Sequence, residues 1–237
     1  MPAESRIEMV RGAELFAAPA GEWHATLHAD LAFLLRALVA PGYVAAVDML
    51  TRTSEATEVA PDASIFPAER DPETLGRKLE ELAFEITDRQ RLGVPTTRAR
   101  ALAERGVRRI FLVRVKARTV CEWSVEKDDW EPLPAGAILD DHCLVRPLPM
   151  AALLDATLAD EAILGALRAK VPALEDAFVE RETQGMRQSL LLVLEGRGLR
   201  LTAADHATID EADLETLSGW LRRAGTVASA ADLLSGR

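Results

Sequence analysis

The stretch "LAFEIT", residues 82–87, decides the fold because a glutamate stands inside an apolar strand signal. Its apolar residues predict a short buried strand. An ionised carboxylate is seldom buried without a partner, since burial removes its hydration. The position of Glu85 therefore calls for a cation nearby, which is either an arginine side chain or a metal ion.

A second carboxylate occupies a similar place upstream. Asp62, in "PDASIF" (residues 61–66), follows a proline and opens a short apolar run. If the two runs are adjacent strands, Asp62 and Glu85 meet at the strand ends and can hold one cation. In the alternative interpretation Asp62 caps a turn, a common role for aspartate after proline, and Glu85 pairs with an arginine. Both interpretations remain open at the level of these two segments.

The rest of the chain limits the class of protein. Its 237 residues suffice for one large domain or for a domain with an appendage. No apolar run approaches the roughly 20 residues that span a bilayer, and the N-terminal stretch lacks the pattern of a signal peptide. We therefore expect a soluble cytoplasmic protein with no membrane partner.

The two cysteines, Cys121 and Cys143, form no metal-ligand spacing and no disulfide framework. Cys143 ends the segment "DDHC" (residues 140–143), which gathers four candidate ligands in a row. Adjacent residues rarely converge on one ion, so this segment is interpreted as a turn that leads into a strand.

The charge is unevenly distributed. The net charge of −10 argues against a protein that coats nucleic acid by bulk attraction. Residues 89–118, however, hold 10 basic and 1 acidic side chains and begin directly after the strand of Glu85. This basic block is either a solvated, arginine-rich helix face or a contact surface for DNA phosphates.

The apolar periodicities predict the order hairpin, helix, three strands, helix and strands, which is typical of an α/β or α+β domain with a mixed sheet. The expected elements are a hairpin around residues 11–12, a helix within 21–42, strands within 43–53, 61–66 and 81–87, a helix over 96–107 that is closed by Gly106, and strands within 108–133. This domain is expected over residues 1–155. Residues 156–237 show helical periodicity and predict an all-α appendage.

Three acids could share a metal ion. Glu8, on the first strand of the hairpin, would join Asp62 and Glu85. Magnesium prefers hard oxygen ligands and usually takes one or two carboxylates from the protein. Such an ion can lower the pKa of a bound water and neutralise charge on a phosphate.

The order of these segments resembles the Uma-type putative restriction endonuclease family of the PD-(D/E)XK nuclease superfamily. The resemblance covers residues 5–155 and rests on "IEMVRGAEL", "EWHATLHADLAFLLRAL", "APDASIF", "LAFEIT" and "RARALAERGVRRIFLVRV". The tail, through "GMRQSLLLVLEGRG" and "IDEADLETLSGWLRRAGTVASAADLL", is similar to the helical C-terminal segment of some transposase-associated recombination nucleases.

The resemblance implies a restriction-endonuclease-like mixed sheet flanked by helices, with Mg²⁺ or Mn²⁺ at its edge. It implies that Glu8, Asp62 and Glu85 are the metal ligands. It also matches His24 to the histidine that opens the family's first helix and lines the site.

The resemblance places Arg98 where the family has a lysine, and Thr87 where the superfamily normally has one. Arginine can hold a phosphate through two hydrogen bonds, but its pKa makes it useless as a base. We expect Arg98 to contact the scissile phosphate, with Arg100 and Arg105 on DNA phosphates further out.

The sequence thus predicts a metal-dependent phosphodiesterase that cuts DNA. The alternative is a catalytically inactive nuclease fold that serves as a binding or assembly module through its helical tail. A homo-oligomer is compatible with either.

Overall fold

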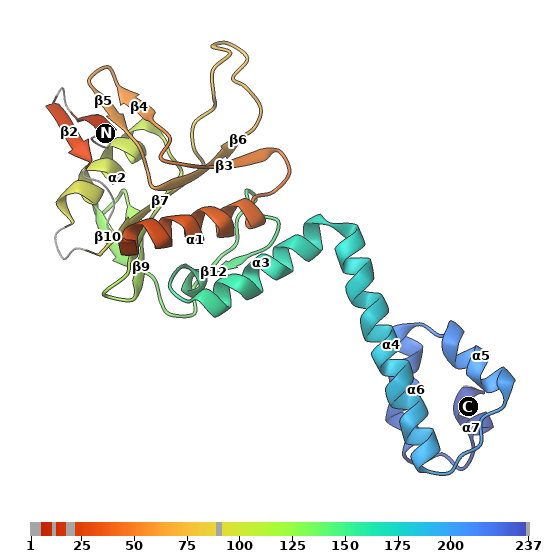
Figure 1. Ribbon diagram of the computed structural model, residues 1–237. Helices are drawn as coiled ribbons and strands as arrows, with labels where there is room; N and C mark the ends of the chain where they lie inside the picture. Colours follow the sequence, from red (N-terminus) through yellow and green to blue (C-terminus); the bar gives the residue numbers. More distant parts are fainter. Residues whose placement is uncertain (1–5, 11–12, 18–21, 89–91, 236–237) are drawn as a thin grey trace. The chain divides into compact units, whose positions relative to one another are not determined.

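A computed structural model describes the chain except for residues 1–5, 11–12, 18–21, 89–91 and 236–237. It contains two compact units, Met1–Lys170 and Val171–Arg237 (Figure 1). The architecture is a mixed sheet flanked by helices, followed by C-terminal helices, as the sequence predicts.

The main sheet of the first unit has six strands in the order β10-β9-β8-β7-β6-β3. Their bounds are β3 Tyr43–Val47, β6 Ala63–Pro67, β7 Leu82–Thr87, β8 Arg109–Arg114, β9 Thr119–Ser124 and β10 Asp129–Pro132. β7 and β8 are parallel, and the other neighbouring pairs are antiparallel. The predicted strands at 61–66 and 81–87 are therefore adjacent, and every residue of β7 is buried.

A second sheet has the order β2-β1-β5-β4. Its strands are β1 Arg6–Val10, β2 Ala13–Ala17, β4 Thr51–Ser54 and β5 Thr57–Val59. β1 and β2 form the predicted hairpin, in which Glu8 pairs with Leu15. Two short strands, β11 Ile138–Leu139 and β12 Leu148–Pro149, pair with each other.

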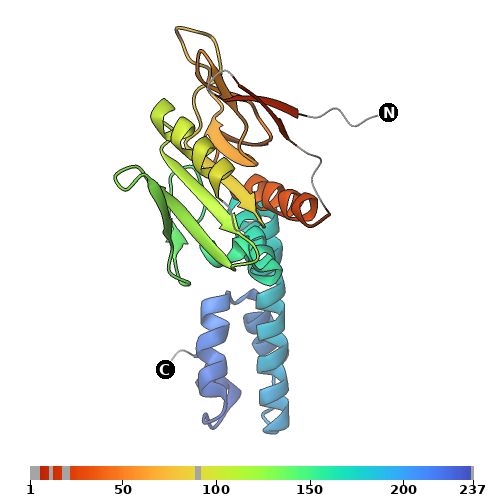
Figure 2. The same cartoon turned by 90° about the vertical axis from the view of Figure 1, so that its left-hand side faces the viewer.

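Two helices cover opposite faces of the main sheet, as Figures 1 and 2 show. α1 (Glu22–Leu38) buries Leu31, Leu34 and Leu38 in a core that also contains Phe84 of β7. α2 (Gly93–Arg105) buries Ala99 and Leu102 in a second core. Successive strand residues point to opposite faces, so Ala83, next to Phe84, belongs to the α2 core. Both helices form because their apolar residues recur at three- and four-residue spacing.

Helix α2 ends as predicted. Gly106 adopts φ 108° and its N–H bonds to the carbonyls of Leu102 and Ala103. This left-handed geometry is accessible to glycine at little steric cost, and it turns the chain into β8.

Helix α3 (Ala156–Lys170), expected in the tail, packs with the first unit after the 3₁₀ turn Met150–Leu153. It contributes Ile163 and Ala166 to the α1 core. Its last residue, Lys170, donates to the carbonyls of Ala37 and Val39 at 3.1 and 3.0 Å. The boundary between the units therefore follows residue 170, whereas the sequence placed it at residue 155.

The second unit is all helical. It consists of α4 Pro172–Gly196, α5 Ala203–Glu211, α6 Leu214–Ala224 and α7 Ala230–Leu234. Figure 2 shows α6 alongside the long α4, and their contact buries Leu190 and Leu194 against Leu217 and Trp220. Across the described residues, no helix combines the length and apolar character that crossing a bilayer requires.

Candidate active site

The strand register brings Asp62 and Glu85 to facing positions. Ala63 of β6 pairs with Phe84 of β7 in an antiparallel ladder. One step along both strands, Asp62, which directly precedes β6, therefore lies across from Glu85 of β7. Only 5% of Asp62 and 1% of Glu85 is exposed to solvent.

The same register extends to a third strand. Val47 of β3 pairs with Ala63, so the next residue, Asp48, lies across from Asp62. Asp48 adopts φ 51°, and its N–H donates to the carbonyl of Asp62 at 3.3 Å. These three carboxylate residues thus form an acid row: Asp48 directly follows β3, Asp62 directly precedes β6, and Glu85 lies in β7.

The Asp62 carboxylate is held by the backbone of the neighbouring strand. The N–H of Ile86 donates to Asp62 Oδ2 at 2.6 Å. This hydrogen bond restrains the side chain before any ligand arrives, which is a requirement of a preorganised site.

Helix α1 adds a nitrogen donor. His28 Nε2 lies 3.5 Å from Asp48 Oδ1, and ligand atoms of His28, Asp48 and Asp62 all lie within 4.8 Å of one another. The group is accessible, because the Asp48 side chain is 48% exposed. One nitrogen and two carboxylate oxygens at this spacing can hold a divalent cation.

Glu85 has an arginine partner. Arg98 Nη1 donates to Glu85 Oε2 at 2.9 Å, and the two side chains are 14% and 1% exposed. Arg98 reaches Glu85 because α2 covers the face of β7 that bears Ala83 and Glu85. A charge-assisted hydrogen bond of this kind offsets the cost of burying the carboxylate. Arg98 is therefore at the predicted site, in contact with Glu85.

Two predicted site residues are described only in part. Glu8 lies on β1 and His24 on α1, but their side chains lie outside the described residues. Among the described side chains, that of His28, one helical turn after His24, lies close to Asp62. His24 and His28 are four positions apart and therefore share a helix face, which is the sequence signal that could have found His28.

Much of the basic block is engaged in ion pairs. Arg100 Nε donates to Asp128 at 2.7 Å, and this hydrogen bond raises the pKa of Arg100. Arg109 Nε donates to Glu122 at 2.6 Å, and Lys116 lies 3.6 Å from Asp88. Arg105, at the end of α2, is exposed. The local excess of positive charge in the sequence is therefore partly neutralised by acids from distant segments.

A solved structure gives one comparison. A putative nuclease belonging to DUF820 from Anabaena variabilis ATCC 29413 is similar over 70% of this chain and 92% of its own chain, at 16% identity and a TM-score of 0.48.

The comparison with curated proteins gives no match to this chain. The comparison with family models matches residues 1–152, which include Asp48, Asp62 and Glu85, to the model Uma2, described as "Putative restriction endonuclease". The chain therefore belongs to the Uma2 family of putative restriction endonucleases.

Proposed function

We propose that the first unit is a metal-dependent endonuclease that hydrolyses phosphodiester bonds of DNA. The observation that carries this proposal is the row of Asp48, Asp62 and Glu85 across three adjacent strands, with His28 beside it. Membership of a nuclease family supports the same reaction class.

The donor set fits a divalent cation. Asp62 is the central ligand in this proposal, with Asp48 and His28 on one side and Glu85 on the other. Glu8, predicted from the sequence, is a further ligand of the cation in this proposal. Magnesium takes oxygen donors, so a contribution from the His28 imidazole would favour Mn²⁺ over Mg²⁺. When bound, the cation would supply a water of lowered pKa and offset the charge of the phosphate.

Arg98 has two tasks in this proposal. Its guanidinium carries five N–H donors in a planar fork, so it can hold Glu85 through Nη1 and still donate to a phosphate oxygen. Arginine does not deprotonate in proteins, so Arg98 stabilises charge and does not act as a base. Arg105 and Arg100 are the proposed outer phosphate contacts. Arg100 can bind a phosphate only if it gives up its hydrogen bond to Asp128.

A second function has a specific observation in its favour. The Arg98–Glu85 pair supplies the buried carboxylate with a counter-charge from within the protein. This arrangement suits an inactive nuclease fold that binds or assembles through its helical tail.

Plasmid cleavage tests the two functions against each other. With Mn²⁺ or Mg²⁺, we expect the wild type to cut and Asp62→Asn to be slower by roughly 10²–10³-fold, the usual cost of removing one electrostatic contributor to the transition state. Arg98→Lys restores the family's residue and should keep or raise the rate. Glu85→Gln, purified in parallel, controls for contaminating nuclease. A wild type and an Arg98→Lys that both fail to cut single- and double-stranded DNA would favour the assembly module.

A further inference from the structure

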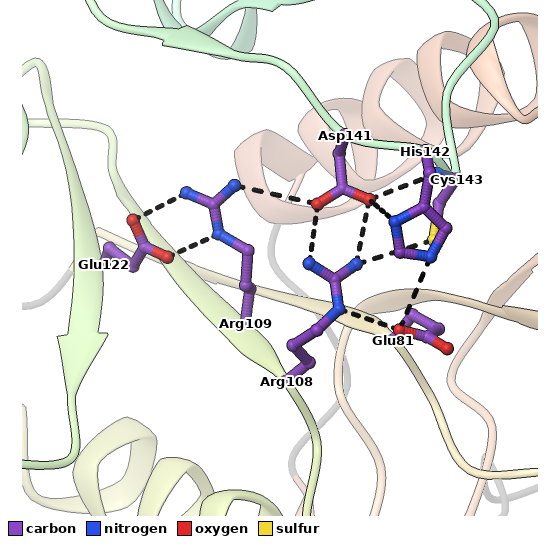
Figure 3. A network of polar contacts seen from close by, with 7 residues as sticks. All are labelled: Glu81, Arg108, Arg109, Glu122, Asp141, His142 and Cys143. Carbon is purple, nitrogen blue, oxygen red and sulfur yellow. Dashed lines mark hydrogen bonds and ion pairs between the residues drawn. The ribbon is translucent and has the colours of Figure 1, made fainter.

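A second group of ligand-type side chains lies at the other end of β7 (Figure 3). Glu81 directly precedes β7, whereas Glu85 lies further along the strand. The loop after β11 brings His142 and Cys143 to Glu81. As predicted, "DDHC" forms a turn, and Cys143 within it is completely buried.

The three side chains have the spacing of metal ligands. One ligand atom each from Glu81, His142 and Cys143 lies within 4.8 Å of the other two. The donor set is one oxygen, one nitrogen and one sulfur. Thiolate and imidazole donors select zinc and similar ions, whereas Mg²⁺ prefers sites made of oxygen.

Asp141 lies where it can orient the histidine. Its Oδ1 is 3.6 Å from His142 Nδ1, while His142 Nε2 faces Glu81 Oε2 at 3.9 Å. A carboxylate on one ring nitrogen that leaves the other for the metal is a recurring arrangement around bound zinc. Arg108 holds Asp141 through two hydrogen bonds of 2.9 and 2.8 Å and also donates to Glu81 at 2.8 Å (Figure 3).

The charges balance when a divalent ion is added. An ion that binds Cys143 releases the thiol proton to solvent and leaves a thiolate. The thiolate, Glu81 and Asp141 then carry three negative charges, which Arg108 and a divalent ion offset.

We propose that Glu81, His142 and Cys143 bind zinc or another thiophilic divalent ion, with water as a further ligand. Access is from the side of His142, whose side chain is 59% exposed. The ion would fasten the loop to the start of β7. The backbone ties the same loop to the segment after α1, since the carbonyl of Cys143 accepts the N–H of Ala40 at 2.8 Å.

A cobalt titration of the full chain tests the site, because Co²⁺ reports thiolate coordination through a near-ultraviolet charge-transfer band. We expect this band in the wild type and in Cys121→Ser, the matched variant of the other buried cysteine. We expect it to vanish in Cys143→Ser and to require at least tenfold more cobalt in His142→Ala. Zinc should abolish the band by competition, and magnesium should not.

A band that is missing in the wild type, or that persists in Cys143→Ser, would overturn the site. If Cys143→Ser does not fold, the exposed position of His142 makes His142→Ala the deciding variant, and an unchanged cobalt midpoint there would equally overturn it. The readout requires no DNA cleavage, so it is independent of the proposed nuclease activity.

Discussion

One glutamate directly precedes β7 and another lies toward its C-terminal end, and the surroundings of Glu81 and Glu85 differ. At the Glu85 end, the neighbouring strands contribute Asp62 and Asp48 in register, and Arg98 pairs with Glu85. At the Glu81 end, arginines from the start of β8 alternate with carboxylates: Arg108 joins Glu81 to Asp141, and Arg109 bonds to Glu122.

The difference teaches that a strand glutamate does not by itself indicate a hard-metal site. The row of aligned carboxylates favours Mg²⁺ or Mn²⁺ at the first end, and the sulfur donor favours zinc at the second. The identity of the neighbours across the sheet decides the chemistry, and this identity depends on strand register.

The largest expected effect comes from breaking the ion pair between Arg98 and Glu85. Arg98→Ala should lower the free energy of unfolding by about 3–5 kcal/mol, because it leaves the buried Glu85 carboxylate without its guanidinium partner. Urea denaturation followed by circular dichroism measures this change. Arg100→Ala removes an exposed arginine of the same helix and should change stability little. Equal losses in the two variants would show that the Glu85 end does not depend on this pair.

A smaller effect concerns acid stability at the Glu81 end. Burial tends to raise the pKa of Asp141, but hydrogen bonds from Arg108 and from the N–H of Cys143 outweigh it and lower the pKa from 3.8 to about 2. Because the folded-state pKa is depressed, the contribution to stability is present above pH 4 and is lost as the pH falls toward 2. We expect this contribution to be about 1–2 kcal/mol.

Denaturation of the wild type and of Asp141→Asn at a series of pH values measures this contribution. The stability difference between them should shrink between pH 4 and pH 2. A difference that stays constant across this range would exclude the linkage.

The smallest effect concerns DNA binding. Because Arg108 and Arg109 are held in ion pairs, we expect few phosphate contacts and a shallow dependence of affinity on salt. Each contact contributes roughly −0.9 to the log–log slope for duplex DNA. Arg105→Ala should remove about one contact and so reduce the magnitude of the slope by roughly 0.9. Fluorescence anisotropy at a series of salt concentrations measures the slope. A steep slope that Arg105→Ala leaves unchanged would place the phosphate contacts elsewhere.

Local sequence patterns predicted much of the fold. The buried run of β7 and the glycine at the end of α2 gave clear signals. An apolar run and a glycine that accepts a left-handed backbone both determine structure within a few residues of the chain. The neighbourhood of Asp62 and Glu85 followed from treating two apolar runs as adjacent strands.

Long-range partners could not be predicted in the same way. Asp48 joins the acid row only through the register of β3 with β6, which depends on the packing of the whole sheet. The partners of the basic block are similarly distant, since Arg100 and Asp128 are 28 positions apart and Arg108 and Asp141 are 33 apart. A charge count along the sequence therefore could not show how much of the positive charge is paired with acids from distant segments.

The contacts of Lys170 have a consequence for the order of folding during synthesis. Its amino group binds carbonyls at the end of α1 that precede it by more than 130 positions. The ribosome must therefore translate α1, the whole sheet and α3 before this end of α1 gains its partner. Domains generally fold as units as they emerge. We infer that the nascent first unit reaches its final state only after Lys170 has left the exit tunnel, while the helical tail is still being made.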